Sequence, residues 1–218
     1  MKNVAIVLAG SGYLDGSEIR EAVLSTLAVD RTGASYKFFS VNKEQHHVVS
    51  HVTSEPSTET RNVLEESARI ARGDIQDISE LNVDEYDALL IPGGFGVAKN
   101  LSSFAFEGSA ASVDPSVATL LQDFNNARKP IGAVCIAPAI VALTLGQKKV
   151  KLTVGAESEA SQELEKTGMI HVECATTDYV YDEENAILST PAYMTSGASL
   201  SDIETGITKM VEKLVSIA

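Results

Sequence analysis

The sequence predicts an α/β fold, a doubly wound and mostly parallel sheet. The apolar, β-branched run "NVAIVLAG" at 3–10 ends in glycine, which is typical of a strand buried on both faces. Helix-like segments of roughly 10–16 residues alternate with such runs, the pattern of parallel βαβ units. No linker, repeat or low-complexity segment interrupts this alternation, so we expect one domain over residues 1–218.

The first strand, 3–10, is followed by further strands along the whole chain. Each is a short apolar or β-branched run next to a turn signal. We expect them at 35–41, 86–94, 130–134, 151–155 and 170–174, with a hairpin over 178–190 that turns at Glu184-Asn185.

The expected helices carry start and stop signals. The segment 16–33 has Ser17 as its N-cap, Gly33 as its stop, and Ile19, Val23 and Leu27 on one face. The remaining helices are 58–73, between Thr58 and Gly73; 114–129, which opens on Asp-Pro; 156–168; and an amphipathic closing helix over 199–217.

Composition excludes several classes of function. There are 17 Lys and Arg residues against 30 Asp and Glu, so the net charge of −13 repels nucleic-acid phosphates. No run approaches the roughly 18 apolar residues that a membrane span needs, and the N-terminal apolar run is too short for a signal peptide. The cysteines Cys135 and Cys174 give neither a disulfide framework nor a metal-binding spacing. We therefore expect a cytoplasmic protein with no membrane and no nucleic-acid partner.

Ligands of doubly wound sheets bind beyond the carboxyl ends of the strands. Three loops follow predicted strands there: 10–17, 92–100 and 135–138. These loops are where we look for the site.

Cys135 stands where the strand "PIGAV" ends and the helix "IAPAIVALTL" begins. Pro138 supports that boundary, because proline fits the first turn of a helix. A thiol ahead of a helix N-terminus is favoured as thiolate, and a sharp strand-to-helix turn exposes it, as in a nucleophile elbow. The alternative is a buried and inert cysteine. Cys174 has no such setting and is interpreted as structural.

Two neighbouring loops supply candidate partners for the thiol. Backbone N–H groups around Gly93 and Gly94 in "IPGGFGVAKN" could form an oxyanion hole, and Asn100 could add a donor; alternatively, these glycines only shape the loop. Glu18 opens the first helix at the edge where Cys135 emerges. Either it stabilises the helix dipole, or, protonated beside the thiolate, it donates a hydrogen bond to sulfur and moves protons.

We expect neither a cofactor nor a metal. The spacing of Gly10, Gly12 and Gly16 misses the dinucleotide fingerprint, and "VNK" offers no ribose-binding acid. His47 and His51 are four residues apart, but no third ligand accompanies them, so a polar loop is the better interpretation.

Seven segments together resemble the ElbB-type isoprenoid-biosynthesis glyoxalases of the PfpI-like, class I glutamine-amidotransferase-like superfamily. These are "GYLDGSEI", "TETRNVLEESARIARG", "IPGGFGVAKNLSSFA", "CIAPA", "TVG", "HVEC" and "STPAYM". The resemblance implies a flavodoxin-like three-layer sandwich and a homodimer.

By this resemblance Cys135 matches the elbow nucleophile and Glu18 its acid. Gly94 and the Ile136 N–H match the oxyanion donors. Many relatives carry a histidine directly after the cysteine, or one near Gly155, and this chain has neither. The resemblance thus implies a Cys–Glu dyad and no protease or glutaminase triad.

The resulting hypothesis is a glutathione-independent, cofactor-independent glyoxalase that converts glyoxal, and less readily methylglyoxal, to glycolate. Cys135 would be the nucleophile and Glu18 the proton carrier, and the partner would be a small dicarbonyl substrate. Two alternatives stay open: a redox-sensing or chaperone-like protective protein that uses Cys135 oxidation, and an amidotransferase-like accessory protein in isoprenoid biosynthesis.

Overall fold

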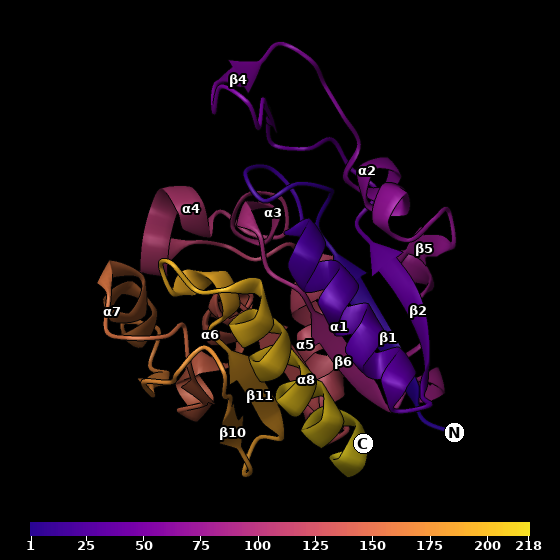
Figure 1. Cartoon of the computed structure of the whole chain (residues 1–218), viewed down its shortest axis with the longest axis vertical. Coiled ribbons are helices and arrows are strands. Elements are labelled where there is room, and N and C mark those ends of the chain that lie inside the picture. Colours follow the sequence, from indigo (N-terminus) through magenta and orange to yellow (C-terminus); the bar gives the residue numbers. More distant parts are fainter.

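The computed structural model describes residues 1–218 and confirms the predicted α/β fold. Seven strands form the central sheet in the order β10-β11-β7-β6-β1-β2-β5, and all neighbours are parallel except β10 with β11 (Figure 1). These strands are β1 (Asn3–Leu8), β2 (Ser35–Ser40), β5 (Ile75–Asp77), β6 (Ala88–Ile91), β7 (Ile131–Val134), β10 (Val180–Asp182) and β11 (Ile187–Thr190). The antiparallel β10–β11 pair is the hairpin predicted over 178–190.

Two small sheets stand apart from the central one. β3 (Val48–Val49) pairs antiparallel with β4 (Pro56–Ser57), and β8 (Lys151–Leu152) pairs parallel with β9 (Ile170–His171). The strands predicted at 151–155 and 170–174 therefore exist in shortened form, but they pair with each other outside the main sheet.

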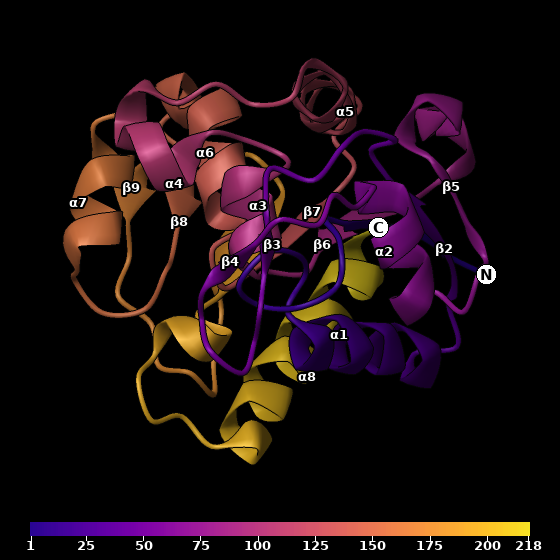
Figure 2. The ribbon, with the colours of Figure 1, turned by 90° about the horizontal axis from the view of Figure 1, so that it is seen from above.

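Helices cover both faces of the sheet (Figure 2). On one face α1 and α8 lie side by side; on the other are α3, α5 and α6. The strands bury alternate side chains accordingly: Val4 and Ile6 of β1 pack toward α1 and α8, and Ala5 and Val7 toward the opposite layer. The helices are α1 (Ile19–Arg31), α2 (Val63–Ile70), α3 (Phe95–Lys99), α4 (Phe104–Glu107), α5 (Pro115–Asn126), α6 (Pro138–Leu145), α7 (Glu159–Glu165) and α8 (Leu200–Ile217). None of them is long and apolar enough to span a membrane.

α1 buries a different face from the one its apolar residues mark. Ile19, Val23 and Leu27 are exposed to solvent. The buried residues are small or acidic: Glu21, Ala22, Ser25, Ala28 and Val29. Small side chains let α1 approach α8 and the sheet closely, and this approach carries the Glu21 carboxyl into the interior.

Two predicted helix caps are wrong. Ser17 does not cap α1, because its hydroxyl accepts a hydrogen bond from the Ala9 N–H at 2.8 Å; Glu18 is the cap instead. Thr58 does not cap α2, because the chain stays extended until Asn62, whose side chain accepts from the N–H groups of Leu64 and Glu65. Asp114 caps α5 ahead of Pro115, as the Asp-Pro signal indicates.

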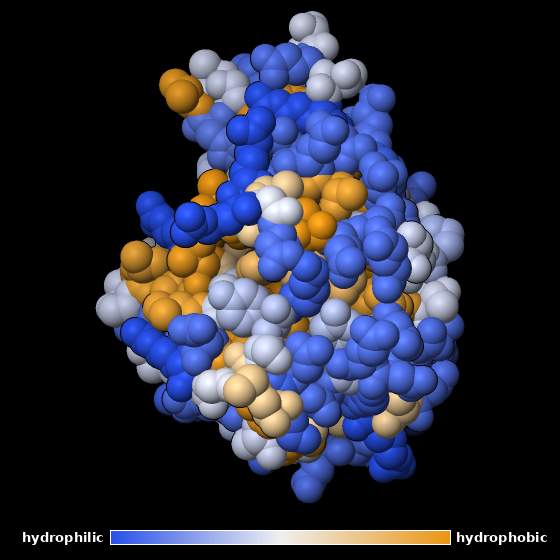
Figure 3. Space-filling view, turned by 90° about the vertical axis from the view of Figure 1, so that its right-hand side faces the viewer, coloured by the Kyte–Doolittle hydropathy of each residue, from blue (hydrophilic) through white to orange (hydrophobic).

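The strand order fixes where a ligand would approach. From β1 the chain proceeds outward to β2 and β5, then returns to the other side of β1 to form β6 and β7. The carboxyl ends of β1 and β6 therefore flank the switch point of the sheet. Residues 43–62, with β3 and β4, project above this edge at the top of Figure 1. Hydrophilic residues cover most of the face in Figure 3, and hydrophobic areas gather below that projection.

Candidate active site

Cys135 occupies a strained turn between β7 and α6. Its φ is +61°, in the left-handed region that costs an L-residue roughly 1–2 kcal/mol. The turn is held by the Cys135 N–H, which donates to the Thr190 carbonyl of the neighbouring strand at 2.9 Å. The residue is only 7% exposed, so only a small electrophile could reach its sulfur without rearrangement. This is the geometry of a nucleophile elbow.

The carboxyl group beside this thiol belongs to Glu21, on the first turn of α1. Glu21 is completely buried. The Gly93 N–H donates to its Oε2 at 3.0 Å and the Tyr193 N–H to its Oε1 at 3.3 Å. A Cβ placed on Gly93 would lie 2.5 Å from Cys135 Cβ and 2.6 Å from Glu21 Oε2. The missing side chain at position 93 is therefore what lets the thiol and the carboxyl group lie against each other.

Burial controls the protonation of this pair. It raises the pKa of Glu21 to about 8, helped by the negative charge of nearby Glu18. Burial also raises the pKa of Cys135 well above its ordinary value, as do the charge and the hydrogen bond of the Glu21 carboxylate. Backbone N–H groups of Gly94 and Ile136 act in the opposite direction by donating to sulfur.

Two of the three causes that raise the pKa of Cys135 require an ionised Glu21. They disappear when Glu21 takes the proton. A thiolate facing a protonated Glu21 carries the same net charge as a thiol facing a carboxylate, so the pair titrates as a unit. The arrangement can hold one proton on either partner and hand it to a bound molecule.

Glu18, the acid expected beside the thiol, lies differently. Its backbone is extended, and its carboxylate caps α1 by accepting from the Glu21 N–H at 2.6 Å. Partial burial raises the pKa of Glu18. Its influence on the thiol passes through Glu21, whose pKa it raises.

The other expected site residues divide into two groups. The backbone N–H groups of Gly94, whose φ is +102°, and of Ile136 act on the Cys135 thiol, where they oppose the rise of its pKa. The Gly93 N–H instead holds Glu21. Asn100 is buried away from the thiol: its amide donates to the Ala9 and Asp15 carbonyls at 2.9 Å each, and its oxygen accepts from the His46 N–H at 2.9 Å. Asn100 thus braces the loop after β1.

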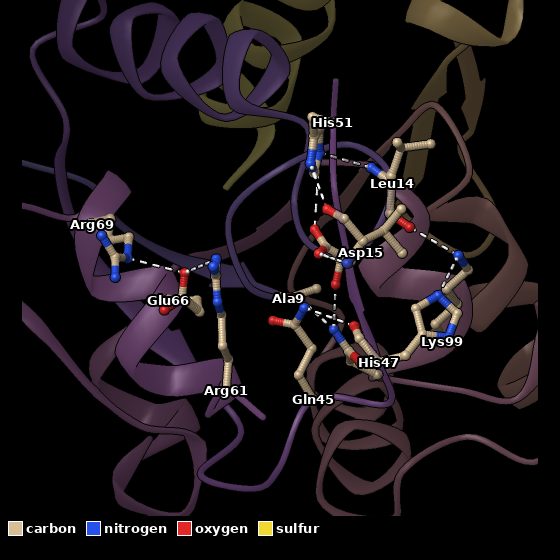
Figure 4. A network of polar contacts seen from close by, with 12 residues as sticks. Ala9, Leu14, Asp15, Gln45, His47, His51, Arg61, Glu66, Arg69 and Lys99 are labelled. Atoms are coloured by element: carbon tan, nitrogen blue, oxygen red, sulfur yellow. Dashed lines mark hydrogen bonds and ion pairs between the residues drawn. The ribbon is translucent and has the colours of Figure 1, made fainter. Parts of the chain in front are cut away.

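A second polar cluster surrounds that loop (Figure 4). We call Asp15, His47, His51, Lys99 and Asn100 the bracing cluster. Asp15 Oδ2 accepts from the Val49 N–H at 2.7 Å, and the Lys99 ammonium donates to the Leu14 carbonyl at 2.8 Å and contacts His47 Nε2 at 3.1 Å. The Leu14 N–H donates to His51 Nε2 at 3.3 Å. The cluster fastens the projecting segment 43–62 to the loop and to α3.

The histidines take no part in the thiol site. His47 and His51 contact different elements, as above, and His171 Nε2 accepts from the Val154 N–H of the β8 region at 3.5 Å. No group of three His, Cys, Asp or Glu side chains is arranged to hold a metal ion. The titratable side chain that lies against Cys135 is the Glu21 carboxyl group.

Glu21 was missed because the sequence suggested that α1 buries the face of Ile19, Val23 and Leu27. A signal was present: Ala22, Ser25 and Ala28 form a small-residue face typical of close packing, and Glu21 borders it. Tyr193, whose N–H holds Glu21, lies in "STPAYM", one of the segments that carry the resemblance.

The comparisons with known proteins identify the family and the fold. The model of the DJ-1/PfpI family matches residues 13–198. The crystal structure of an isoprenoid biosynthesis protein with amidotransferase-like domain from Ehrlichia chaffeensis is 45% identical, covers 100% of this chain and 99% of that one, and superposes with a TM-score of 0.92. Drosophila melanogaster DJ-1beta is 16% identical, with a TM-score of 0.57 over 98% and 90% of the two chains, and shares the fold.

Curated relatives also match nearly all of this chain. The rat "ES1 protein homolog, mitochondrial" is 40% identical over 98% of this chain and 83% of its own. The human "Glutamine amidotransferase-like class 1 domain-containing protein 3, mitochondrial" is 40% identical over 98% and 82%.

These names correct one expectation. The two mammalian relatives and the zebrafish ES1 protein, 33% identical, are all named mitochondrial proteins. The predicted cytoplasmic location, which rested on cysteine usage and the short N-terminal apolar run, is therefore wrong. With a family model that spans most of the residues and relatives that align over nearly the whole length, the chain belongs to the DJ-1/PfpI family.

Proposed function

We propose that the protein is a cofactor-independent glyoxalase, with Cys135 as nucleophile and Glu21, rather than Glu18, as the proton carrier. One observation carries the proposal: a buried carboxyl group whose pKa is raised to about 8 lies against a thiol on a strained elbow. A group that both gives and accepts a proton near neutral pH is what an internal proton shift between two carbons requires.

In the first step the Cys135 thiolate attacks one aldehyde carbon of glyoxal and forms a C–S bond. The carbonyl oxygen becomes an alkoxide, and its proposed donors are the Gly94 and Ile136 N–H groups, which favour the thiolate form of Cys135. Glu21 gives its proton to that oxygen. The product is a hemithioacetal and the Glu21 carboxylate.

In the second step the Glu21 carboxylate removes the hydrogen from the sulfur-bearing carbon, and the electrons move through an enediol. The hydroxyl proton on the sulfur-bearing carbon moves to the oxygen of the second carbon, and Glu21 returns its proton to that second carbon. The first carbon is thereby oxidised to a thioester and the second is reduced to an alcohol. Water cleaves the thioester, which releases glycolate and restores the thiol. Electrons balance within the substrate, so the sequence needs no external oxidant or reductant.

Two variants and one control variant test this proposal. Cys135→Ser and Glu21→Gln should each lower glyoxal consumption and glycolate release at least about 100-fold, the usual contribution of a nucleophile or proton carrier. Cys174→Ser is the control, because burial raises the pKa of that thiol to about 11 and it lies outside the site. Turnover by Cys135→Ser at the wild-type rate would rule out the proposal.

A second candidate, oxidation sensing, uses the same atoms. The Gly94 and Ile136 N–H groups and a protonated Glu21 could donate hydrogen bonds to oxygens placed on sulfur, which favours a stable oxidised form. Intact mass after mild peroxide treatment, measured beside glyoxal turnover, separates the two functions. Oxidation of Cys135 without turnover in untreated protein would favour sensing.

Two further expectations concern glutaminase activity and the oligomeric state, and each has its own assay. Glutaminase chemistry lacks support because no histidine contacts Cys135, and assaying ammonia release from glutamine checks it. A homodimer is part of the proposal on the strength of family membership, and light scattering after size exclusion measures it.

A further inference from the structure

Tyr193 makes two hydrogen bonds that link the exposed surface to the buried acid. Its backbone N–H donates to Glu21 Oε1 at 3.3 Å, and its phenol oxygen accepts from the Arg20 guanidinium at 2.9 Å. Arg20 precedes Glu21 in the first turn of α1. A closed loop of contacts therefore runs from Arg20 through the Tyr193 side chain to its backbone and back to α1.

The turn that carries Tyr193 is strained. Residues Ala192–Met194 form a single 3-10 turn after β11, and Ala192, fully buried, has a φ of +44°. Thr190, two residues earlier, accepts the hydrogen bond from the Cys135 N–H. Two non-glycine residues in this region have left-handed backbone: Cys135, which acts on the Glu21 carboxyl group, and Ala192, which precedes the Tyr193 N–H that donates to it. A strained turn persists only where its surroundings hold it.

We propose that Arg20 and Tyr193 are positioning residues: their side-chain hydrogen bond holds the 192–194 turn so that the Tyr193 N–H stays on Glu21 and sets how readily Glu21 releases its proton. The inference deepens the proposed function, because it concerns the same acid. It needs only the Cys135–Glu21 contact, so it holds even if glyoxal is not a substrate.

The charges around Glu21 determine the direction of the effect. Glu18 and Cys135 are the titratable groups that act on it; burial raises the pKa of Glu18, and the charge of Arg20 opposes that rise. Burial likewise raises the pKa of Glu21, and donation from the Tyr193 N–H opposes that rise. Loosening the turn therefore keeps Glu21 protonated to higher pH. Cys135 and Glu21 together lose two protons in two steps, and the step at higher pH, here called the upper step, moves to still higher pH.

The experiment measures the rate of Cys135 alkylation by iodoacetamide from pH 5 to 10, resolved by mass spectrometry. Tyr193→Phe keeps the ring and removes only the oxygen that Arg20 binds, so no charge changes. We expect the upper step to rise by about half a pH unit, roughly a threefold change in the ionisation constant. Arg20→Gln should shift the step in the same direction, Arg20→Lys should restore most of the wild-type profile, and the double variant should shift no further than Arg20→Gln alone.

Arg31→Gln is the matched control, because Arg31 lies at the other end of α1 and pairs with Glu204. It should leave the profile unchanged. Melting temperatures should stay within about 2 °C of wild type for Tyr193→Phe, since one exposed hydrogen bond contributes little to stability. A Tyr193→Phe profile that superposes on wild type, or an equal shift in Arg31→Gln, would overturn the inference.

Discussion

Asp15 and Glu21 are two buried carboxyl groups six residues apart, on either side of the start of α1, and their surroundings differ. Asp15 belongs to the bracing cluster, where the Val49 N–H donates to its carboxylate and the Lys99 ammonium lies nearby. Glu21 has only two backbone N–H groups and a thiol, with a second acid, Glu18, close by. A buried charge that is compensated holds structure together, whereas a buried acid left without a cation keeps its proton and can use it.

The largest expected effect comes from filling the space between the thiol and the acid. Gly93→Ala places a methyl group 2.5 Å from Cys135 Cβ and 2.8 Å from the Val134 carbonyl, neither of which can move freely. We expect about 3 kcal/mol of destabilisation and loss of Cys135 alkylation at pH 7. Urea unfolding and mass spectrometry measure the two.

Gly33→Ala is the control for that substitution. It meets no atom within 4 Å and carries only the strain of φ +76°, so it should cost about 1 kcal/mol and leave alkylation intact. Normal alkylation in Gly93→Ala would mean that thiol and acid do not need the shared space.

The next prediction tests whether the bracing cluster supports the fold without affecting the ionisation of Cys135. Asn100→Ala leaves the His46 N–H and the Ala9 and Asp15 carbonyls without their partner. We expect roughly 2–3 kcal/mol of destabilisation, the cost of stranding buried polar groups. The pH midpoint of Cys135 alkylation should not move. A shifted midpoint at unchanged stability would make Asn100 a site residue after all.

The two regions should also respond to pH with opposite sign. Burial raises the pKa of Glu21 to about 8, so the folded protein keeps a proton that the unfolded chain releases above pH 4.5. The free energy of unfolding is therefore highest below pH 4.5 and falls as pH rises toward 8, by up to about 1.4 kcal/mol per pH unit. Burial and the charge of Lys99 lower the pKa of His47, so the unfolded chain binds a proton there more readily than the folded protein does. The free energy of unfolding therefore falls as pH drops below 6.5, by less than about 1 kcal/mol.

Unfolding free energies at pH 5, 6.5 and 8 measure both. Glu21→Gln should reduce the decrease in unfolding free energy between pH 5 and pH 8. His47→Gln should reduce the smaller decrease between pH 6.5 and pH 5. If Glu21→Gln leaves the slope unchanged, Glu21 is ionised throughout this range and cannot be the proton carrier.

The position of Cys135 could be predicted because its signals are local. A β-branched run, a turn and Pro138 mark a strand-to-helix boundary, and parallel strands bring such boundaries to one edge of the sheet. The same logic located the Gly94 turn. These features depend on the order of elements, which the alternating pattern indicates directly.

The acid could not be assigned in this way. With Ser17 as cap, Glu18 would be the first helical residue; because the Ser17 hydroxyl binds the Ala9 N–H, the helix starts one residue later and Glu18 becomes the cap. Which face of α1 is buried depends on its packing against α8 and the sheet, a tertiary effect that overrides the apolar periodicity of Ile19, Val23 and Leu27. For Asn100, nothing local showed that its amide would turn toward the loop after β1.

The central claim is that Glu21, and not Glu18, shares a proton with Cys135. The most direct test is the pH profile of Cys135 alkylation in Glu21→Gln and Glu18→Gln. Since the charge and the hydrogen bond of the Glu21 carboxylate raise the pKa of Cys135, Glu21→Gln should abolish the second step at high pH and leave a single step about one pH unit below it. Glu18→Gln should keep both steps and move them by less than half as much, because Glu18 acts only through the pKa of Glu21. A large shift in Glu18→Gln beside an unchanged profile in Glu21→Gln would contradict the account.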